Sequence, residues 1–206
     1  MQLFFAVLFI FYIFAFNYYL VDSVQPFQRP VDDQFPWYAV RLFTFSHRGL
    51  EEFFQDHGVE CFIPRQYVDF VDKEGKRQRE LRPVVRNLFF VKKDRDEKFF
   101  RSVFQEAPFK MSVIRKSSDN PAYYEIPSHQ MFEFRVMCNP EIQMRKFLSE
   151  EEAVLKVGTP VIVTHGPLKG LSGKLVRQSK KYFLLKEVPG MAVMMKVTRW
   201  CCKAVE

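Results

Sequence analysis

The stretch Val161–Arg177 reads VIVTHGPLKGLSGKLVR and decides the fold that we expect for the C-terminal part of the chain. It begins with a run of β-branched residues and ends with a second β-prone run, KLVR. Between these runs lie Gly166-Pro167, Gly170 and Gly173, residue types that allow turns and close backbone approach. The pattern predicts two strands joined by a glycine-rich loop.

This strand–loop–strand unit resembles the KOW motif, which opens small SH3-like β-barrels in transcription elongation factors and some ribosomal proteins. The resemblance assigns Gly166, Lys169, Gly170 and Gly173 to the KOW loop. Turn residues at 178–181 and 189–190 separate three further apolar runs. Five short strands are therefore expected, in an all-β barrel over residues 156–206.

The net charge of +7 is concentrated in this part of the chain. Residues 154–206 contain 10 Lys or Arg but only Glu187 and Glu206, whereas residues 37–153 contain 20 basic and 19 acidic residues. Such an excess favours an anionic partner, usually RNA or DNA, and solvation of a small barrel explains it equally well. The sequence shows no array of stacked aromatic residues beside the charge.

The first 21 residues, MQLFFAVLFIFYIFAFNYYLV, contain no charged side chain and are long enough to span a bilayer as a helix. They lack the basic start and small-residue cleavage site of a secretory signal. Three interpretations remain: a membrane anchor, a translated extension upstream of the natural start, or an apolar arm on a soluble protein. We favour the extension and expect residues 1–36 to be an apolar helical segment with a linker. We also expect no membrane partner, despite residues 3–21, and a cytoplasmic location.

Residues 37–139 alternate between strand and helix patterns in the order β-α-β-β-α-β, with a further short helix after Pro127. The order predicts an α+β domain in which two helices cover one face of an antiparallel sheet. The apolar run in VVRNLFFVKK marks a buried central strand, and DKEGKRQ a charged hairpin tip. Residues 140–155 read as an acidic, exposed linker.

Several short motifs follow one another in a characteristic order: WYAV at 37–40, ECFIP at 60–64, a basic hairpin, PVVRNLFFV at 83–91 and the KOW-like stretch. This succession resembles the NusG family of transcription elongation factors. Asn87 and PAYYEIPSHQM at 121–131 are similar to specialised RfaH-like and UpxY-type paralogues, the latter being antiterminators of capsular polysaccharide operons. Arg86 and Leu88 depart from the family, which has a proline and an aromatic residue there. The resemblance implies an NGN-like domain at 37–139 before the KOW domain, and one paralogue folds the latter as a helical hairpin instead.

The resemblance implies a transcription antitermination or elongation factor, specific for an operon of the polysaccharide type, that bridges the clamp and the opposite lobe of RNA polymerase. By position, the resemblance implies that Val85, Leu88 and Phe90 contact the polymerase clamp. It implies that Arg101 and Ser102 contact the opposite polymerase lobe. It also implies that Arg41, His47 and Arg48 contact DNA. Each of these residues also has a structural interpretation, as core for Phe90 and as a solvated helix face for the charged residues.

The expected partners are RNA polymerase, non-template DNA or leader RNA, and the ribosome through the KOW domain, with the protein itself a monomer. A different class of function is a KOW-type RNA-binding protein that acts with ribosomes, and a third is a membrane-tethered interaction protein. The sequence contains no nucleophile elbow and no phosphate-binding glycine loop, so we expect no enzyme activity and no cofactor. Cys61, Cys138, Cys201 and Cys202 lack metal-ligand spacing, which predicts free thiols in a reducing compartment and no metal.

Overall fold

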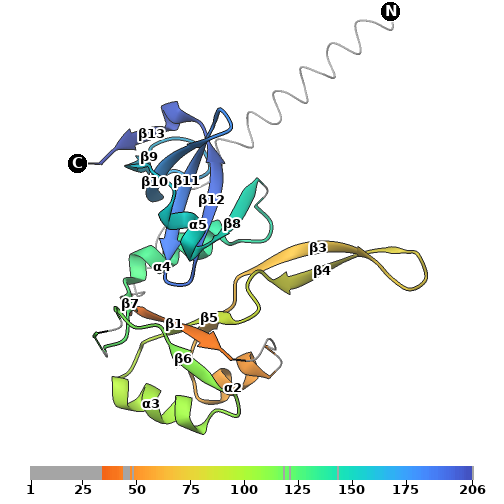
Figure 1. Cartoon of the computed structure of the whole chain (residues 1–206), viewed down its shortest axis with the longest axis vertical. Helices are drawn as coiled ribbons and strands as arrows, with labels where there is room; N and C mark the ends of the chain where they lie inside the picture. Colours follow the sequence, from red (N-terminus) through yellow and green to blue (C-terminus); the bar gives the residue numbers. More distant parts are fainter. Residues whose placement is uncertain are drawn as a thin grey trace, which may run out of the picture.

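The computed structural model describes residues 34–43, 47, 49–117, 119–120, 122–142 and 144–205. These residues form an N-terminal lobe (34–142) and a C-terminal lobe (144–205), which lie at the two ends of the long axis with helix α4 between them (Figure 1). The expected class, mixed α+β with antiparallel sheets, is confirmed. The apolar segment at 1–21 lies outside the described residues. None of the helices in the described part has the length and apolar character needed to cross a bilayer.

The elements of the N-terminal lobe are β1 (Trp37–Leu42), α2 (Leu50–Asp56), β2 (Cys61–Phe62), β3 (Arg65–Val71), β4 (Arg77–Pro83), β5 (Leu88–Lys92), α3 (Glu97–Glu106), β6 (Met111–Val113), β7 (Glu125–Ile126) and α4 (Ser128–Met137). One antiparallel sheet has the strand order β2-β5-β1-β6, with β7 paired to β1. The central pair, β1 and β5, is in the register Ala39↔Phe90 and Val40↔Phe89. The expected β-α-β-β-α-β order therefore folds into one sheet with the strand pair β3–β4 outside it.

Both faces of this sheet are covered by helices, because successive side chains of a strand point to opposite sides. Tyr38, Val40 and Phe89 pack in one cluster with Phe54 of α2 and Phe100 of α3. The alternate residues of β1 and β5 pack in a second cluster with α4, on the other face. The continuous apolar run of β5 is thus explained by burial on both sides.

The strands β3 and β4 leave the sheet at Pro64 and form a separate two-stranded ribbon. Proline has no backbone N–H and weakens a central ladder, so β2 ends at Phe62 and the chain resumes as β3 at Arg65. Figure 1 shows the ribbon extending sideways from the waist of the molecule. We refer to residues 65–83 as the ribbon.

The elements of the C-terminal lobe are β8 (Arg145–Ser149), α5 (Glu150–Val154), β9 (Thr159–Val163), β10 (Ser172–Gln178), β11 (Lys181–Val188), β12 (Met191–Val197), η1 (Arg199–Cys201) and β13 (Cys202–Ala204). The six strands of this lobe form one antiparallel sheet in the order β13-β9-β10-β11-β12-β8. The expected turns at 178–181 and 189–190 are present as the β10–β11 and β11–β12 connections.

The segment 140–155, expected to be an exposed linker, instead contributes a strand and a helix to this lobe. Strand β8 pairs with β12, with Leu148 opposite Ala192 and buried. The residues Met191–Met195 of β12 are all buried, so the backbone N–H and C=O groups along the outer edge of this strand need hydrogen-bond partners. Strand β8 supplies these partners. The acidic run is the first turn of α5, where carboxylates interact favourably with the helix dipole.

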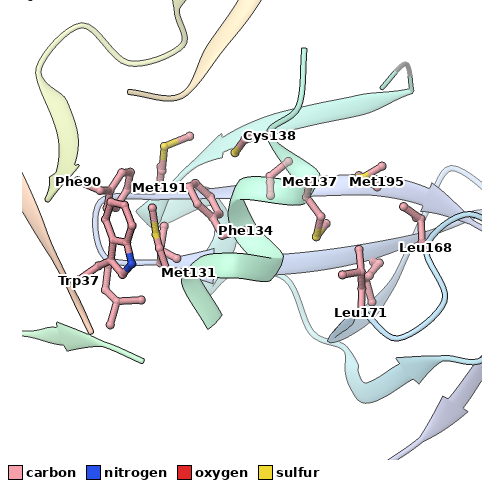
Figure 2. Packing of buried hydrophobic residues seen from close by; sticks show 14 of the residues in the cluster. Trp37, Phe90, Met131, Phe134, Met137, Cys138, Leu168, Leu171, Met191 and Met195 are labelled. Atoms are coloured by element: carbon pink, nitrogen blue, oxygen red, sulfur yellow. The ribbon is translucent and has the colours of Figure 1, made fainter. Parts of the chain in front are cut away.

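A single hydrophobic cluster joins the two lobes through α4 (Figure 2). The aromatic ring of Phe134 on α4 lies with its centroid 5.5 Å from that of Phe90 on β5. On its other side the helix faces Met191 and Met195 of β12, in the same cluster. Fully burying one side chain of this size contributes roughly 1.5–3 kcal/mol. The two lobes are therefore in apolar contact, not merely connected by a linker.

Candidate nucleic-acid interface

The ribbon presents cationic and aromatic side chains on an exposed pair of strands. Directly opposed residues share a face of the ribbon, and the pairs Tyr67↔Leu81 and Asp69↔Arg79 lie on one such face. The guanidinium of Arg79 stands 4.2 Å from the centroid of the Tyr67 ring. On the opposite face, Arg82 stands 5.0 Å from the centroid of the Phe70 ring. Each arginine also has a carboxylate neighbour, Asp69 at 3.8 Å from Arg79 and Glu80 at 2.8 Å from Arg82, so cation–π contacts and ion pairs together hold the two arginines along the ribbon.

A hydrogen bond at the base of the ribbon joins it to the end of the N-terminal lobe. The Tyr67 hydroxyl donates to Oε1 of Glu141 at 2.8 Å. This bond, with the charge of the same carboxylate, raises the pKa of the Tyr67 phenol above its ordinary value. The ribbon is thereby tethered at its base, and its tip at 72–76 is exposed.

A groove of about 800 Å³ lies where the ribbon meets the rest of the lobe. Its cationic and polar lining comes from His47, Arg65, Glu80, Arg82 and Arg86, and its apolar lining from Val68, Leu81, Pro83 and Val84. The groove therefore combines cationic and apolar side chains in one place. A groove of this composition suits a flexible anionic chain that also carries apolar rings.

The arginines of the groove differ in how strongly they are neutralised. Arg65 bonds to Glu51 on α2 at 2.5 Å, and Arg82 bonds to Glu80 at 2.8 Å. Arg86 has no ion-pair partner among the residues that the structure describes. Arg86 is thus the cation most available to an external phosphate.

The His47 imidazole lines the groove as a neutral group. Burial lowers its pKa below the ordinary value, an effect that a hydrogen bond with the backbone of Leu88 partly opposes. Its Nε2 is buried and makes no hydrogen bond within the described part of the chain. A neutral imidazole can donate or accept one hydrogen bond, which suits a base edge or a ribose hydroxyl more than a phosphate.

The residues expected to contact the polymerase clamp do not form an open surface. Leu88 and Phe90 are buried, with exposed fractions of 2% and 0%, and Val85 is half-buried against the same cluster. The expectation that Val85, Leu88 and Phe90 form an exposed apolar contact surface is therefore wrong for the structure in which the two lobes touch. The reason is that α4 and the C-terminal lobe cover this face of the sheet, which a strand pattern alone does not reveal.

Close packing marks the point where the C-terminal lobe covers Leu88. Gly190, in the turn between β11 and β12, has a φ of 90°, and a Cβ atom there would lie 2.9 Å from both δ-carbons of Leu88. A glycine is needed at this position both for the backbone conformation and for the contact. Leu88 is thus a contact residue between the lobes.

The remaining expected contact residues are separated from one another. Arg41, on β1, forms an ion pair with Glu150 of α5 at 3.4 Å, so it bridges the lobes instead of joining His47 in the groove. Arg48 lies outside the described residues. Arg101 and Ser102 are exposed on α3 and bond within the helix, to Glu97 and Glu106 respectively. Only His47 of this set therefore lies in the groove.

The expected KOW loop forms the β9–β10 connection. Gly166 and Gly170 both have positive φ, at 82° and 93°, and Lys169 is exposed between them. At Gly173 a Cβ atom would lie 2.5 Å from the carbonyl oxygen of Leu185, so a side chain does not fit beside β11. The glycines thus have the turn and close-approach roles that their spacing predicts.

A buried polar cluster fixes α4 against the C-terminal lobe. The Glu133 carboxylate pairs with Lys186 on β11 and accepts hydrogen bonds from the backbone N–H and the hydroxyl of Ser172, both at 2.9 Å. The side chains of Glu133 and Lys186 are only 12% and 10% exposed. Such a pair requires its full set of partners, so it specifies how the two lobes dock.

Sequence reasoning missed Arg65, Arg82 and Arg86 as groove residues and missed the pair between Glu133 and Lys186. The signal for the arginines was their position in or next to the expected basic hairpin, whereas nothing in the sequence pairs Glu133 with a lysine 53 residues away. Within the described residues, no three His, Cys, Asp or Glu side chains come together in a way that could hold a metal ion. No protein-family model matches this chain, and no curated protein matches it either.

Proposed function

We propose that this chain is a non-enzymatic transcription antitermination or elongation factor of the NusG type, acting on an operon of its own, such as a polysaccharide locus. In this proposal the N-terminal lobe is an NGN-like domain, the C-terminal lobe is a KOW domain, and the protein bridges the clamp and the opposite lobe of RNA polymerase. The observation that carries it is the cationic groove between His47 and Arg86, beside an exposed ribbon on an α+β lobe.

The groove would contact the non-template DNA strand of a transcription complex. The unpaired guanidinium of Arg86 would contact a phosphate. The His47 imidazole would bond to a base edge after a side-chain movement that uncovers its Nε2. Val84 and Leu81 supply the apolar wall against which an unstacked base can lie. Arg86 therefore replaces Arg41 as the cation that we pair with His47.

The polymerase clamp would contact the face of β5 after the C-terminal lobe has moved away from it. Leu88 is covered by the turn at Gly190 and Phe90 by Phe134 of α4, so exposing both requires α4 to move away together with the C-terminal lobe. A partner that binds them stabilises this open form at the expense of the closed one. The polar part of the contact between the lobes includes the Glu133–Lys186 pair and the exposed Arg41–Glu150 pair. The exposed surface of α3, with Arg101 and Ser102, would meet the opposite polymerase lobe.

The test is retention of core RNA polymerase by immobilised full-length protein, comparing wild type, Glu133→Gln and Arg86→Glu. We expect Glu133→Gln to increase retention, because it weakens the contact that covers β5. Arg86→Glu should leave core retention unchanged and reduce retention of a complex with exposed non-template DNA. Lys110→Glu, an equal charge change at an exposed position outside both α3 and the groove, is the matched control for the DNA effect.

Failure of both wild type and Glu133→Gln to retain polymerase would overturn the polymerase part of the proposal. Equal loss of DNA with Arg86→Glu and Lys110→Glu would show general electrostatics and not a groove.

A second function, an RNA-binding protein that acts with ribosomes, is favoured by the basic surface of the C-terminal lobe. Among the described residues from 156 onward the acidic side chain is Glu187, and it is paired with Lys174 at 2.9 Å. Co-purification from cells separates the two functions, because ribosomal RNA without polymerase would support the second.

A further inference from the structure

The C-terminal lobe contains a hollow of about 640 Å³ in which aromatic and cationic side chains meet. It is formed by the β10–β11 turn, the end of β12 and η1. Two rings line it, Tyr182 and Trp200, together with four cationic side chains, Lys180, Lys181, Lys196 and Arg199. The sequence separates these residues, which is why no aromatic array is visible beside the charge until the lobe is folded.

Trp200 is unusually accessible for an indole ring. Its exposed fraction is 73%, whereas Trp37, the other tryptophan of the chain, is fully buried. The His165 ring lies 5.6 Å from Trp200, inclined at 42°, and supports one side of the indole. Tyr182, in the same hollow, is half-buried, with the guanidinium of Arg177 at 5.8 Å from its ring. The hollow thus presents the exposed indole of Trp200 and the half-buried ring of Tyr182 to the solvent.

The cations of the hollow are free to neutralise an external charge. In the part of the chain that the structure describes, Lys180, Lys181, Lys196 and Arg199 form no ion pair. Four unpaired cations around two rings attract a ligand that carries regular negative charges and flat apolar groups together. A single-stranded nucleic acid has both at a spacing of one nucleotide.

We infer that this hollow binds single-stranded RNA, with bases stacking on Trp200 and Tyr182 and with phosphates on the surrounding lysines and Arg199. RNA is favoured over DNA by Thr198, an exposed residue in the wall of the hollow that carries a hydroxyl. That hydroxyl has only the sulfur of Cys201, a weak partner, at 2.9 Å, so it can exchange to a ribose 2′-hydroxyl.

The inferred site stands apart from the groove at His47 and does not require RNA polymerase. It deepens the second function proposed above by giving it a binding site. Because the binding test uses only purified protein and oligonucleotide, its failure leaves the polymerase proposal untouched.

The experiment is a titration of purified full-length protein with an oligouridine of about 12 nucleotides, read by tryptophan fluorescence. Trp37 is buried, so quenching reports on Trp200. We expect quenching by RNA that Trp200→Ala abolishes, with an affinity about tenfold lower by anisotropy of labelled RNA. Trp200→Phe retains a ring and should recover most of the affinity. Unchanged circular dichroism of both variants is expected, because the side chain is exposed.

The cations are tested by the salt dependence of binding. Lys181→Glu should reduce the slope of log affinity against log salt by about 0.7, between about 50 and 200 mM. Lys203→Glu is the matched control, because Lys203 is exposed on β13 and does not line the hollow. An equal effect of Lys203→Glu would overturn the assignment to this hollow.

Three further outcomes would overturn the inference. One is RNA binding by Trp200→Ala as tight as by wild type. Another is equal or tighter binding of oligothymidine of the same length, which would remove the role given to the ribose hydroxyl. The last is displacement of the RNA by anionic vesicles or by polyglutamate at equal charge, which would show a site for charge alone.

Discussion

At the scale of single residues, Glu133 and Lys186 form a salt bridge between two side chains of low exposure. Removing one partner leaves the other charge buried and uncompensated. We expect Glu133→Gln to lower the free energy of unfolding by about 3–5 kcal/mol, measured by urea denaturation. Glu97→Gln is the control, since Glu97 pairs with Arg101 on the exposed surface of α3 and should change stability by less than about 0.5 kcal/mol. Similar losses in both variants would contradict the role of burial.

The Cys61 thiol makes the free energy of unfolding depend on pH, and the raised pKa of this thiol sets the direction of the change. Burial raises the pKa of its thiol to about 12, against a value of about 8.5 in the unfolded chain. Between these values the folded state retains a proton that the unfolded state has lost, so stability falls as pH rises. We expect the unfolding free energy of wild type to fall more steeply than that of Cys61→Ala above about pH 9, by roughly 1.4 kcal/mol per pH unit. Parallel curves from about pH 7 to about pH 10 would refute this.

At the scale of elements, α5 is short and relies on its N-cap. The Ser149 side chain accepts a hydrogen bond from the Glu152 backbone, and the Glu152 carboxylate accepts one from the Ser149 backbone. We expect Ser149→Ala to lower stability by about 0.5–2 kcal/mol in thermal or urea unfolding. Ser102→Ala, in the exposed middle of α3, should be nearly neutral. The capping interpretation fails if the two substitutions cost the same.

The helices and strands are largely predictable from the sequence, whereas the segments that pack over each face of a sheet are not. The strand and helix patterns of residues 37–139 predicted the order of these elements, because the patterns depend on local geometry. The burial of Leu88 and Phe90 on the second face depends on a helix and a lobe distant in the sequence. For the same reason, the groove around His47 and the pairing of Arg41 with Glu150 could not be predicted.

At the scale of the whole molecule, the turn at Gly190 controls how closely the lobes approach. We expect Gly190→Ala to separate them, because the new methyl group would lie 2.9 Å from Leu88 and the φ of 90° adds strain. Amide hydrogen exchange should become faster in β5 and α4. Gly75→Ala is a matched control, since it also sits in a hairpin turn with a φ of 82° but has nothing within 4 Å of the new methyl group. Faster exchange in β5 with both variants would indicate general strain.

The pairing of β8 with β12 determines where the protein can be cut for separate study of its halves. A fragment that starts at Lys156 would lack the edge strand and expose the backbone of Met191–Met195 along its full length. An unprotected edge of this kind recruits strands from other copies and leads to aggregation. Expression from Ser128 onward keeps the edge closed and retains Glu133 of α4 as the partner of Lys186, so the domain boundary useful at the bench precedes the acidic run by about twenty residues.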